Sequence, residues 1–568
     1  MLRITLLFSS LALLLSWLLP SHFRPWPTAY QELLAAIALM LALWSLVSIK
    51  APMKIPIANL FIFLIAGIPL AQYLSGLILY SGDVWFATSY IVTLAISMTT
   101  AFNLQRIDRK TLSFEFATGL AWVILLGSLI STILALYQWL GLSNAQWIFA
   151  LAPGSRPSAN IAQPNNLATL LGMGLAALIY LFEQKKLSSL TSIVFAALLL
   201  LGMTLTQSRT PWLVAVFILV FWAWQRHRLS LRLTNWHMAA WAGIYVVLLF
   251  AVPWLADLLH LSASSPIERA QQMSRLGLYN QFVHAIVQGP WYGYGWNQIF
   301  TAQAAIALEH SHHEPTVYTH NILLDLLIWN GPVLGSLIIF GAAFWLWQLL
   351  SKANSLTATF AWLALSFLIF HSMLEYPHAY LFFLIPTGLL LGILQASISQ
   401  PEKTLHLPKW LIAITAILIT IFTALFWRDY GLIEQEHQAA VLESHSQFTD
   451  KKDQDISNIY LLTQMREYIY FIRLPLQSDY SEAQLHELRD TIKRYPHFYF
   501  LLKAAYILAL NDFTEEAHDY LMVIPGLNSP KKLEQALTYL LHQSSEQPKL
   551  LPLLKLFNIQ PETSTDAQ

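Results

Sequence analysis

Two arginines and a histidine have the residue types that phosphate binding and proton transfer require, and each borders a long apolar segment. Arg209 lies in the short segment 207–210, Arg275 lies in a long loop, and His320 directly precedes another apolar segment. Arginine binds phosphate through a planar fork of donors and stays charged. Histidine, with an unperturbed pKa of about 6.5, is suited to accept a proton at neutral pH. These residues indicate a site that binds an anion and removes a proton.

The same residues also have structural interpretations. An arginine between two apolar segments can be a snorkelling anchor to lipid headgroups, and a histidine at the mouth of a membrane helix is often a hydrogen-bonded structural residue. The catalytic interpretation is favoured because other polar residues accompany the candidates. A cluster later in the chain consists of His371, Glu375, Tyr376 and His378. The catalytic hypothesis therefore needs His320 and both arginines to share one face of the membrane.

Two other segments carry side chains with possible chemistry. Residues 289–296 alternate aromatic residues and glycine, which suits either a membrane-interface belt or stacking on a carbohydrate. Residues 309–314 contain ligand types for a divalent metal, but their spacing matches no zinc motif and favours a solvated loop. The sequence has no cysteine, and we find no glycine-rich phosphate loop, no Asp-x-Asp pair and no Gly-x-Ser-x-Gly elbow. Nucleotide chemistry in the cytoplasm is therefore not expected.

Composition shows what must position these residues. Of 568 residues, 56% are hydrophobic and only 11% are charged, whereas soluble domains are usually about 25% charged. Mean hydropathy is +0.51, and the formal net charge of zero predicts no affinity for nucleic acid. The chain is predicted to be an all-α polytopic membrane protein.

A membrane helix needs about 20 apolar residues, and thirteen segments qualify. Their approximate limits are 4–19, 31–49, 56–75, 84–101, 116–140, 166–182, 189–206, 211–225, 237–258, 321–350, 355–373, 379–398 and 409–427. The first lacks a small-residue cleavage site and is taken as a span rather than a signal peptide. The tenth is long enough to tilt or to break at Asn330-Gly331-Pro332.

Charge predicts the orientation, because retained lysine and arginine mark the cytoplasmic side. With the N-terminus in the cytoplasm, fourteen basic residues fall inside: Arg3, Lys50, Lys54, Arg106, Arg109, Lys110, Lys185, Lys186, Arg226, Arg228, Arg232, Lys352, Lys403 and Lys409. The opposite short loops hold three, namely Arg24, Arg156 and Arg209, and the long outer loop at about 259–320 adds Arg269 and Arg275. This orientation predicts that Arg209, Arg275 and His320 all face outward.

The prediction divides the chain into a transmembrane catalytic domain, 1–428, and a small outer helical domain, 429–568. Apolar residues in the tail recur at helical spacing, as at Leu501, Leu502 and Ala505. Residues 503–525 are weakly similar to a tetratricopeptide unit, a helix–turn–helix repeat. A helical domain without a peptide-binding groove is the alternative.

The order of the motifs resembles a known family. An outer loop that carries Arg275 and continues through residues 318–323 to 330–332 resembles the bacterial O-antigen ligase and polymerase superfamily. Arg156-Pro157 and the Gln163-Pro164-Asn165 segment, with Leu374-Glu375-Tyr376-Pro377, resemble segments of PglL-type protein O-oligosaccharyltransferases. The chain departs from that group at Asn166, where histidine is common.

The resemblance implies a GT-C-like fold and en bloc transfer of a preassembled glycan from undecaprenyl diphosphate to a serine or threonine of a periplasmic protein, a pilin or pilin-like protein, at the bacterial inner membrane. By the same resemblance, His320 matches the essential base, Arg209 and Arg275 match arginines that engage the diphosphate, and Gln163 and Tyr376 match residues of donor handling. Arg156 and Asn321 belong to the same matched segments and complete the expected substrate site. This scheme requires neither a metal nor a cofactor.

Two rivals remain. An O-antigen ligase or glycan polymerase of the same superfamily would act on a lipid or glycan acceptor. A transporter of lipid-linked oligosaccharides would need charges at mid-membrane depth, for which Asp325 is the clearest candidate, but such proteins often show two related halves and this sequence shows no internal repeat.

Overall fold

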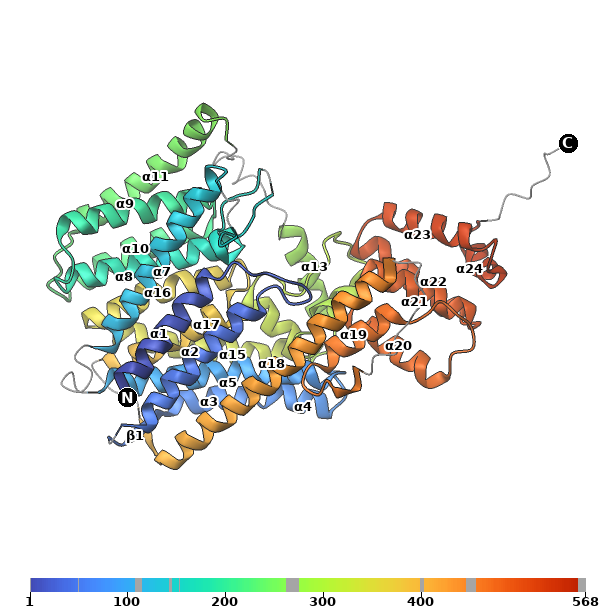
Figure 1. The fold of residues 1–568 in the computed structure, drawn as a ribbon, viewed down its shortest axis with the longest axis horizontal. Coiled ribbons are helices and arrows are strands. Elements are labelled where there is room, and N and C mark those ends of the chain that lie inside the picture. Colours follow the sequence, from blue (N-terminus) through green and yellow to red (C-terminus); the bar gives the residue numbers. More distant parts are fainter. Residues whose placement is uncertain are drawn as a thin grey trace. The chain divides into compact units, whose positions relative to one another are not determined.

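The computed structural model describes residues 2–49, 51–107, 115–142, 146–152, 154–261, 275–398, 403–445 and 456–559 (Figure 1). The chain divides into two compact units that do not follow sequence order. Unit 1 comprises residues 1–68, 88–273 and 341–427, and unit 2 comprises residues 69–87, 274–340 and 428–568. Four residues of the predicted charge pattern, Lys50, Arg109, Lys110 and Arg269, lie outside the described residues.

Unit 1 is a bundle of apolar helices. Its elements are α1 (Leu2–Leu18), α2 (Ala29–Val47), β1 (Met53–Pro56), α3 (Ile57–Ile65), α7 (Phe116–Trp139), η1 (Ala159–Ile161), α8 (Pro164–Glu183), α9 (Ser189–Leu205), α10 (Thr210–Arg226), α11 (Asn235–Leu258), α16 (Leu356–Ser372), η2 (Pro377–Ala379), α17 (Leu381–Ser397) and β2 (Thr404–Leu407). Most of α5 (Ser81–Gln105), the end of α15 (Ile322–Ser351) and the start of α18 (Lys409–His445) also belong to it.

The helices confirm a multi-pass, predominantly helical membrane protein. Within the described residues, eight helical segments are long and apolar enough to cross a bilayer, and five shorter apolar helices, α1, α9, α10, α16 and α17, accompany them in the same bundle. Each of the thirteen predicted segments coincides with one of these. The number of actual crossings stays a prediction.

Close packing at the centre of unit 1 depends on small residues. A Cβ atom at Gly172 of α8 would overlap the ring of Phe367 on α16, and one at Gly174 would overlap Ser128 on α7. Apolar side chains gain nothing from leaving lipid, so membrane helices associate through such close contacts. Helix α8 is accordingly the most buried of the eight long spans.

Three features of unit 1 and its boundaries differ from or refine the prediction. The predicted span 56–75 is two helices, α3 and α4 (Ile68–Leu74), because Gly67 and Pro69 interrupt regular helix. The predicted break in α15 is confirmed, since Gly331 has φ 73° and ψ 167°. Unexpectedly, β1 and β2 form a two-stranded antiparallel sheet with Met53 opposite Leu407. That pairing requires an even number of crossings between the strands, as the predicted topology also does.

Unit 2 combines three stretches of the sequence. It holds α4, the first turns of α5, α13 (Arg275–Gln288), α14 (Ile299–Ile306) and the first part of α15. From the tail it adds the rest of α18, η3 (Ile456–Asn458), α19 (Thr463–Arg473), α20 (Glu482–Arg494), α21 (Phe498–Leu510), α22 (Thr514–Leu527), α23 (Pro530–Gln543), η4 (Pro548–Leu550) and α24 (Leu551–Leu556). Helix α18 continues through residue 428, so the predicted domain boundary falls inside a helix.

The tail helices pack against their neighbours in sequence, from orange to red in Figure 1. Helices α21 and α22 are joined by a short turn in which Asp512 has φ 70°. The core that they share with α23 includes Leu501, Leu508, Leu521 and Leu540. The similarity of this pair to a tetratricopeptide unit stays a prediction.

A buried ion pair joins the tail to the first turn of α5 inside unit 2. Arg494 of α20 donates from Nε and Nη2 to both carboxylate oxygens of Asp83, each at 2.8 Å. Asp83 is 2% exposed. Next to the pair, Thr463 accepts from the Gly82 amide at 2.9 Å, and burial, assisted by the charge of Arg494, lowers the pKa of His497 to about 4. His497 is therefore neutral at physiological pH and does not compete for Asp83.

We expect Asp83→Asn to lower the free energy of unfolding of the tail helices by about 3 kcal/mol, because it leaves the buried Arg494 without its counter-charge. Hydrogen exchange of α20 in the purified full chain would measure this as faster exchange. The exposed pair Lys549–Asp512 provides a control, since Lys549→Gln should change the same quantity by less than about 1 kcal/mol. Equal effects of the two variants would contradict the importance of the buried pair.

Candidate functional site

The start of α8 is shaped by the residues predicted for donor handling. The side-chain oxygen of Gln163 accepts from the Asn166 amide at 2.6 Å and caps the helix, while Pro164 occupies its first turn. A side-chain acceptor satisfies one of the amide groups left without partners at a helix start. Gln163 therefore has a structural task beside any contact with a ligand.

The Glu-Tyr-Pro segment is tied to the same helix. Asn165 donates from Nδ2 to Oε1 of Glu375 at 2.9 Å, and Thr169 lies 2.8 Å from Nδ1 of His371. His371 is fully buried and Glu375 is 6% exposed. These bonds fix the end of α16 on the start of α8. Tyr376 follows them and lies half-buried against Tyr380, with ring centroids 5.8 Å apart.

Arg156 and Arg209 belong to the same end of unit 1. Arg156 donates to the carbonyl of Thr206 at 3.2 Å, which joins the segment before α8 to the end of α9. Arg209 lies three residues after Thr206 and immediately precedes α10. In the turn between α9 and α10, Gln207 has φ 50°. Four predicted residues, Arg156, Gln163, Arg209 and Tyr376, therefore gather at one end of the unit 1 bundle.

His320 is held in unit 2 by contacts to both its backbone and its ring. Tyr279 donates to the His320 carbonyl at 3.2 Å, and Thr316 Oγ1 lies 3.4 Å from the ring nitrogen Nε2. The Asp325 carboxylate accepts from the Thr319 amide at 2.8 Å. His320 has φ 60°, a left-handed conformation that costs a non-glycine residue about 1–3 kcal/mol and is often found at functional sites. These contacts fix the backbone of His320 and place the Thr316 hydroxyl against its ring.

Arg275 lies on α13, the helix whose Tyr279 contacts residues 316–321, which we call the histidine loop. It is the first residue of α13 and stands four residues before Tyr279, so both occupy one face of the helix. Because Tyr279 reaches the His320 carbonyl, the face that carries Arg275 is turned toward the histidine loop. Asn321, predicted as a substrate ligand, accepts from the Leu323 amide at 2.9 Å and caps the start of α15.

The aromatic-glycine segment supports the break in α15. The amides of Tyr294 and Gly295 donate to the carbonyls of Ile328 and Trp329, at 2.8 and 3.2 Å. The ring of Trp296 stacks on Trp329 with centroids 5.0 Å apart. This part of the segment is therefore structural, whereas Trp291 and Tyr292 are 72% and 52% exposed. The choice between an interface belt and carbohydrate stacking concerns those two residues.

The histidine-rich segment 309–314 packs on α13. His310 stacks on His284 with centroids 3.6 Å apart, and its carbonyl accepts from Gln281 at 2.6 Å. His312 lies 3.8 Å from Glu314. Among the described residues, no three histidine or acidic side chains converge in a way that could hold a metal ion.

Sequence reasoning missed two residues that contact His320 and did not foresee the contact of a third, Asp325, with the backbone beside it. Thr316 and Tyr279 contact His320, but nothing in their spacing distinguishes them from other hydroxyl residues. Asp325, considered as a transport charge, instead bonds to the backbone beside His320. Its position five residues after His320, in the first turn of α15, was the available signal, because an acidic residue there is a common partner for backbone amides.

Comparisons with known proteins identify the family to which the chain is related. Three family models match: protein glycosylation ligase at residues 157–182, O-antigen ligase at 194–339, and the C-terminal part of a virulence-factor membrane-bound polymerase at 359–527. These three matches indicate a membrane-bound glycosyltransferase of the O-antigen ligase type. No solved structure matches the chain significantly.

Two relatives from Acinetobacter baylyi specify the family. One, a general O-oligosaccharyltransferase, is 31% identical over 539 residues, which cover 92% of each chain. The other, a ComP-specific O-oligosaccharyltransferase, is 27% identical over 423 residues, or 73% of this chain and 74% of that protein. The chain belongs to the O-oligosaccharyltransferase family. It is therefore a glycosyltransferase enzyme, as the sequence predicted.

We expect Gly331→Ala to lower stability by at least about 2 kcal/mol, because a Cβ at this positive φ would overlap the Trp291 carbonyl. Thermal unfolding of the purified chain would show a lower Tm. Gly341 in the same helix has open space around it, so Gly341→Ala should leave the Tm unchanged or raise it slightly. Equal Tm values for the two variants would contradict the tight contact at the break.

Proposed function

We propose that this enzyme transfers a preassembled oligosaccharide en bloc from undecaprenyl diphosphate to a serine or threonine hydroxyl of a periplasmic protein. Membership in the O-oligosaccharyltransferase family supports transfer of an oligosaccharide to protein. The observation that supports the mechanism is the bond from Tyr279 to the backbone carbonyl of His320, because Tyr279 and Arg275 lie one turn apart on α13. We propose that Arg275 supplies the cation for a phosphate and His320 the base for a hydroxyl.

The donor diphosphate is held by Arg209 and Arg275 at the outer membrane surface, with C1 of its first sugar facing His320. As the acceptor oxygen bonds to C1, the bond from C1 to the diphosphate oxygen breaks and negative charge develops on the diphosphate. Guanidinium groups fixed in advance stabilise that charge better than water does.

The proton of the acceptor hydroxyl goes to His320, and Thr316 selects the nitrogen that receives it. Thr316 donates its own hydroxyl hydrogen to the Tyr318 carbonyl at 2.8 Å. Its oxygen then serves as acceptor toward Nε2 of His320. We assign the resting proton to Nε2 on this basis, which leaves Nδ1 as the base. The same contact stabilises the imidazolium that forms.

We place the enzyme in the bacterial inner membrane, with its N-terminus in the cytoplasm and the tail and active site in the periplasm. The asymmetry of lysine and arginine supports this orientation. We propose a pilin or pilin-like protein as acceptor. That one relative is described as ComP-specific supports recognition of a defined protein.

A second candidate function is favoured by the O-antigen ligase model, whose match spans Arg209, Arg275 and His320. A ligase would transfer the glycan to lipid A-core rather than to protein. The same residues would act in the same roles, so only the acceptor separates the two functions. Product on lipid A-core with none on protein would establish the ligase.

Replacing the base should remove most of the activity. We expect His320→Ala to lower transfer by roughly 10²–10⁴-fold, the usual contribution of a general base, without preventing membrane insertion. Purified enzyme, glycan donor and pilin acceptor would be combined, and intact-mass spectrometry would count the glycans added. The control is His313→Ala, at an exposed position that precedes His320 in the chain, and it should retain normal transfer. Near-normal transfer by His320→Ala would exclude this mechanism.

The two arginines should not tolerate lysine. We expect Arg209→Lys and Arg275→Lys each to lower kcat/KM by about tenfold or more, because a point charge cannot make the two parallel bonds of a guanidinium. Arg228, which stacks on Trp224 at 4.6 Å, offers a matched control, and Arg228→Lys should leave transfer unchanged. Unchanged donor affinity and turnover in both site variants would refute their contact with the diphosphate.

A further inference from the structure

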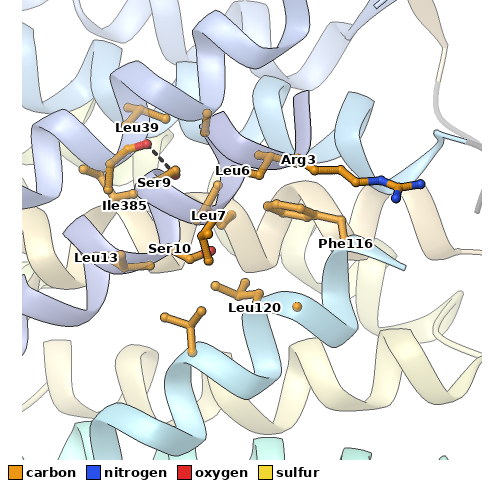
Figure 2. A pocket seen from close by; sticks show the side chains of 15 residues that line it. Arg3, Leu6, Leu7, Ser9, Ser10, Leu13, Leu39, Phe116, Leu120 and Ile385 are labelled. Carbon is orange, nitrogen blue, oxygen red and sulfur yellow. Dashed lines mark hydrogen bonds between the residues drawn. The ribbon is translucent and has the colours of Figure 1, made fainter. Parts of the chain in front are cut away.

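Unit 1 contains a cavity of about 280 Å³ that the transfer reaction does not use. Helices α1, α2, α7 and α17 wall it, and Figure 2 shows the side chains that line it. Leu6, Leu13, Leu120 and Ile385 make it apolar over most of its surface. An apolar cavity between membrane helices is suited to a hydrocarbon chain.

Two hydroxyl groups, those of Ser9 and Ser10, lie in the otherwise largely apolar wall of the cavity. Ser9 donates its hydroxyl to the Ala38 carbonyl at 2.7 Å, as the dashed line in Figure 2 marks. A hydroxyl engaged with a neighbouring helix offers little to a polar ligand. Apart from the Ser10 hydroxyl, the wall therefore suits an apolar group, and the charge in the lining is that of Arg3.

The mouth of the cavity is cationic. Arg3, in the first turn of α1, is exposed and lines the cavity. In Figure 2 its side chain extends beside Phe116 and away from Leu13. The start of a 17-residue helix adds positive potential at the same place. A ligand with an apolar chain and an anionic head matches this distribution of charge.

The length of the cavity matches one leaflet. Its lining residues on α1 run from Arg3 to Leu13, ten residues that span about 15 Å along a helix. The hydrocarbon core of a bilayer is about 30 Å thick. The cavity therefore reaches from one membrane surface to about the midplane, the depth of one acyl chain.

This cavity is distinct from the candidate functional site. At the other end of α1, Asn160 donates to the Leu18 carbonyl at 2.7 Å, just before the segment that caps α8 with Gln163. Arg3 and Leu18 are separated by almost all of α1. The donor-binding residues of unit 1 thus lie at one end of this helix and the mouth of the cavity at the opposite end.

We propose that this cavity binds an anionic phospholipid of the leaflet in which α1 begins, with one acyl chain between α1 and α7 and the phosphate on Arg3. Basic pockets between membrane helices are known to favour anionic headgroups. A polyprenyl chain long enough to cross the bilayer fits a one-leaflet cavity poorly, so the occupant is a structural lipid rather than the glycan donor.

Native mass spectrometry of the full-length chain tests the proposal with two lipids of identical acyl chains, phosphatidylglycerol and phosphatidylethanolamine. The unmodified chain should retain phosphatidylglycerol about fivefold better than phosphatidylethanolamine. This factor corresponds to the affinity that one arginine adds near an anionic headgroup. Arg3→Gln should abolish that preference. Lys409→Gln removes another exposed cation at a helix start and should preserve it.

A second pair of variants tests the cavity itself. Gly119 lines it, so Gly119→Leu should fill it and lower retention of both lipids severalfold. Gly243 has open space around it on α11, and Gly243→Leu should leave retention unchanged. Undiminished retention in Gly119→Leu, or an unchanged preference in Arg3→Gln, would overturn the proposal. Displacement of bound phospholipid by a polyprenyl phosphate would also overturn it, in favour of the donor as occupant.

Discussion

The scarcity of water within a bilayer is the constraint on which this structure depends, because each buried polar group must then find its partner inside the protein. Asn160 shows how far one residue can serve that need. Its side chain donates to the carbonyls of Leu18 and Trp147 and accepts from the Phe149 amide. The end of α1 and the segment 147–149 are thereby both held on Asn160 at one end of unit 1, shortly before the start of α8. The candidate site is built where these satisfied polar groups accumulate.

The same requirement separates candidate residues that stabilise local structure from those proposed to take part in the reaction. Gln163, Asn321 and Asp325 each accept a backbone amide, so a substitution there would disturb local structure before it disturbed chemistry. His320 is different, because its left-handed backbone is imposed by its neighbours and its ring meets the Thr316 hydroxyl. Losses of activity at the supporting residues therefore carry less information about catalysis than losses at His320.

Much of the helical framework could be predicted, because a run of apolar residues is a local property of the sequence. Even the break at Gly331 was visible, since glycine and proline adjoin there. The pairing of β1 with β2 and the bond between Asp83 and Arg494 were not, because each joins residues more than 300 positions apart and no periodicity marks either. The types of the site residues could be read from charge in an apolar context. Their contacts, such as Thr316 with His320, depend on how a loop folds.

Within unit 2, the tail helices contact the part of the chain that leads to the histidine loop. Thr301 of α14 donates to the Lys493 carbonyl of α20, and the Gly526 carbonyl accepts from the His312 amide. The loop that carries His320 is therefore held on one side by α15 and on the other by tail helices. Because the buried Asp83–Arg494 pair anchors those helices to α5, the tail need not bind an acceptor to matter for transfer. A variant that loosens the tail would lower the rate with every acceptor equally, whereas loss of an acceptor-docking surface would affect acceptors selectively.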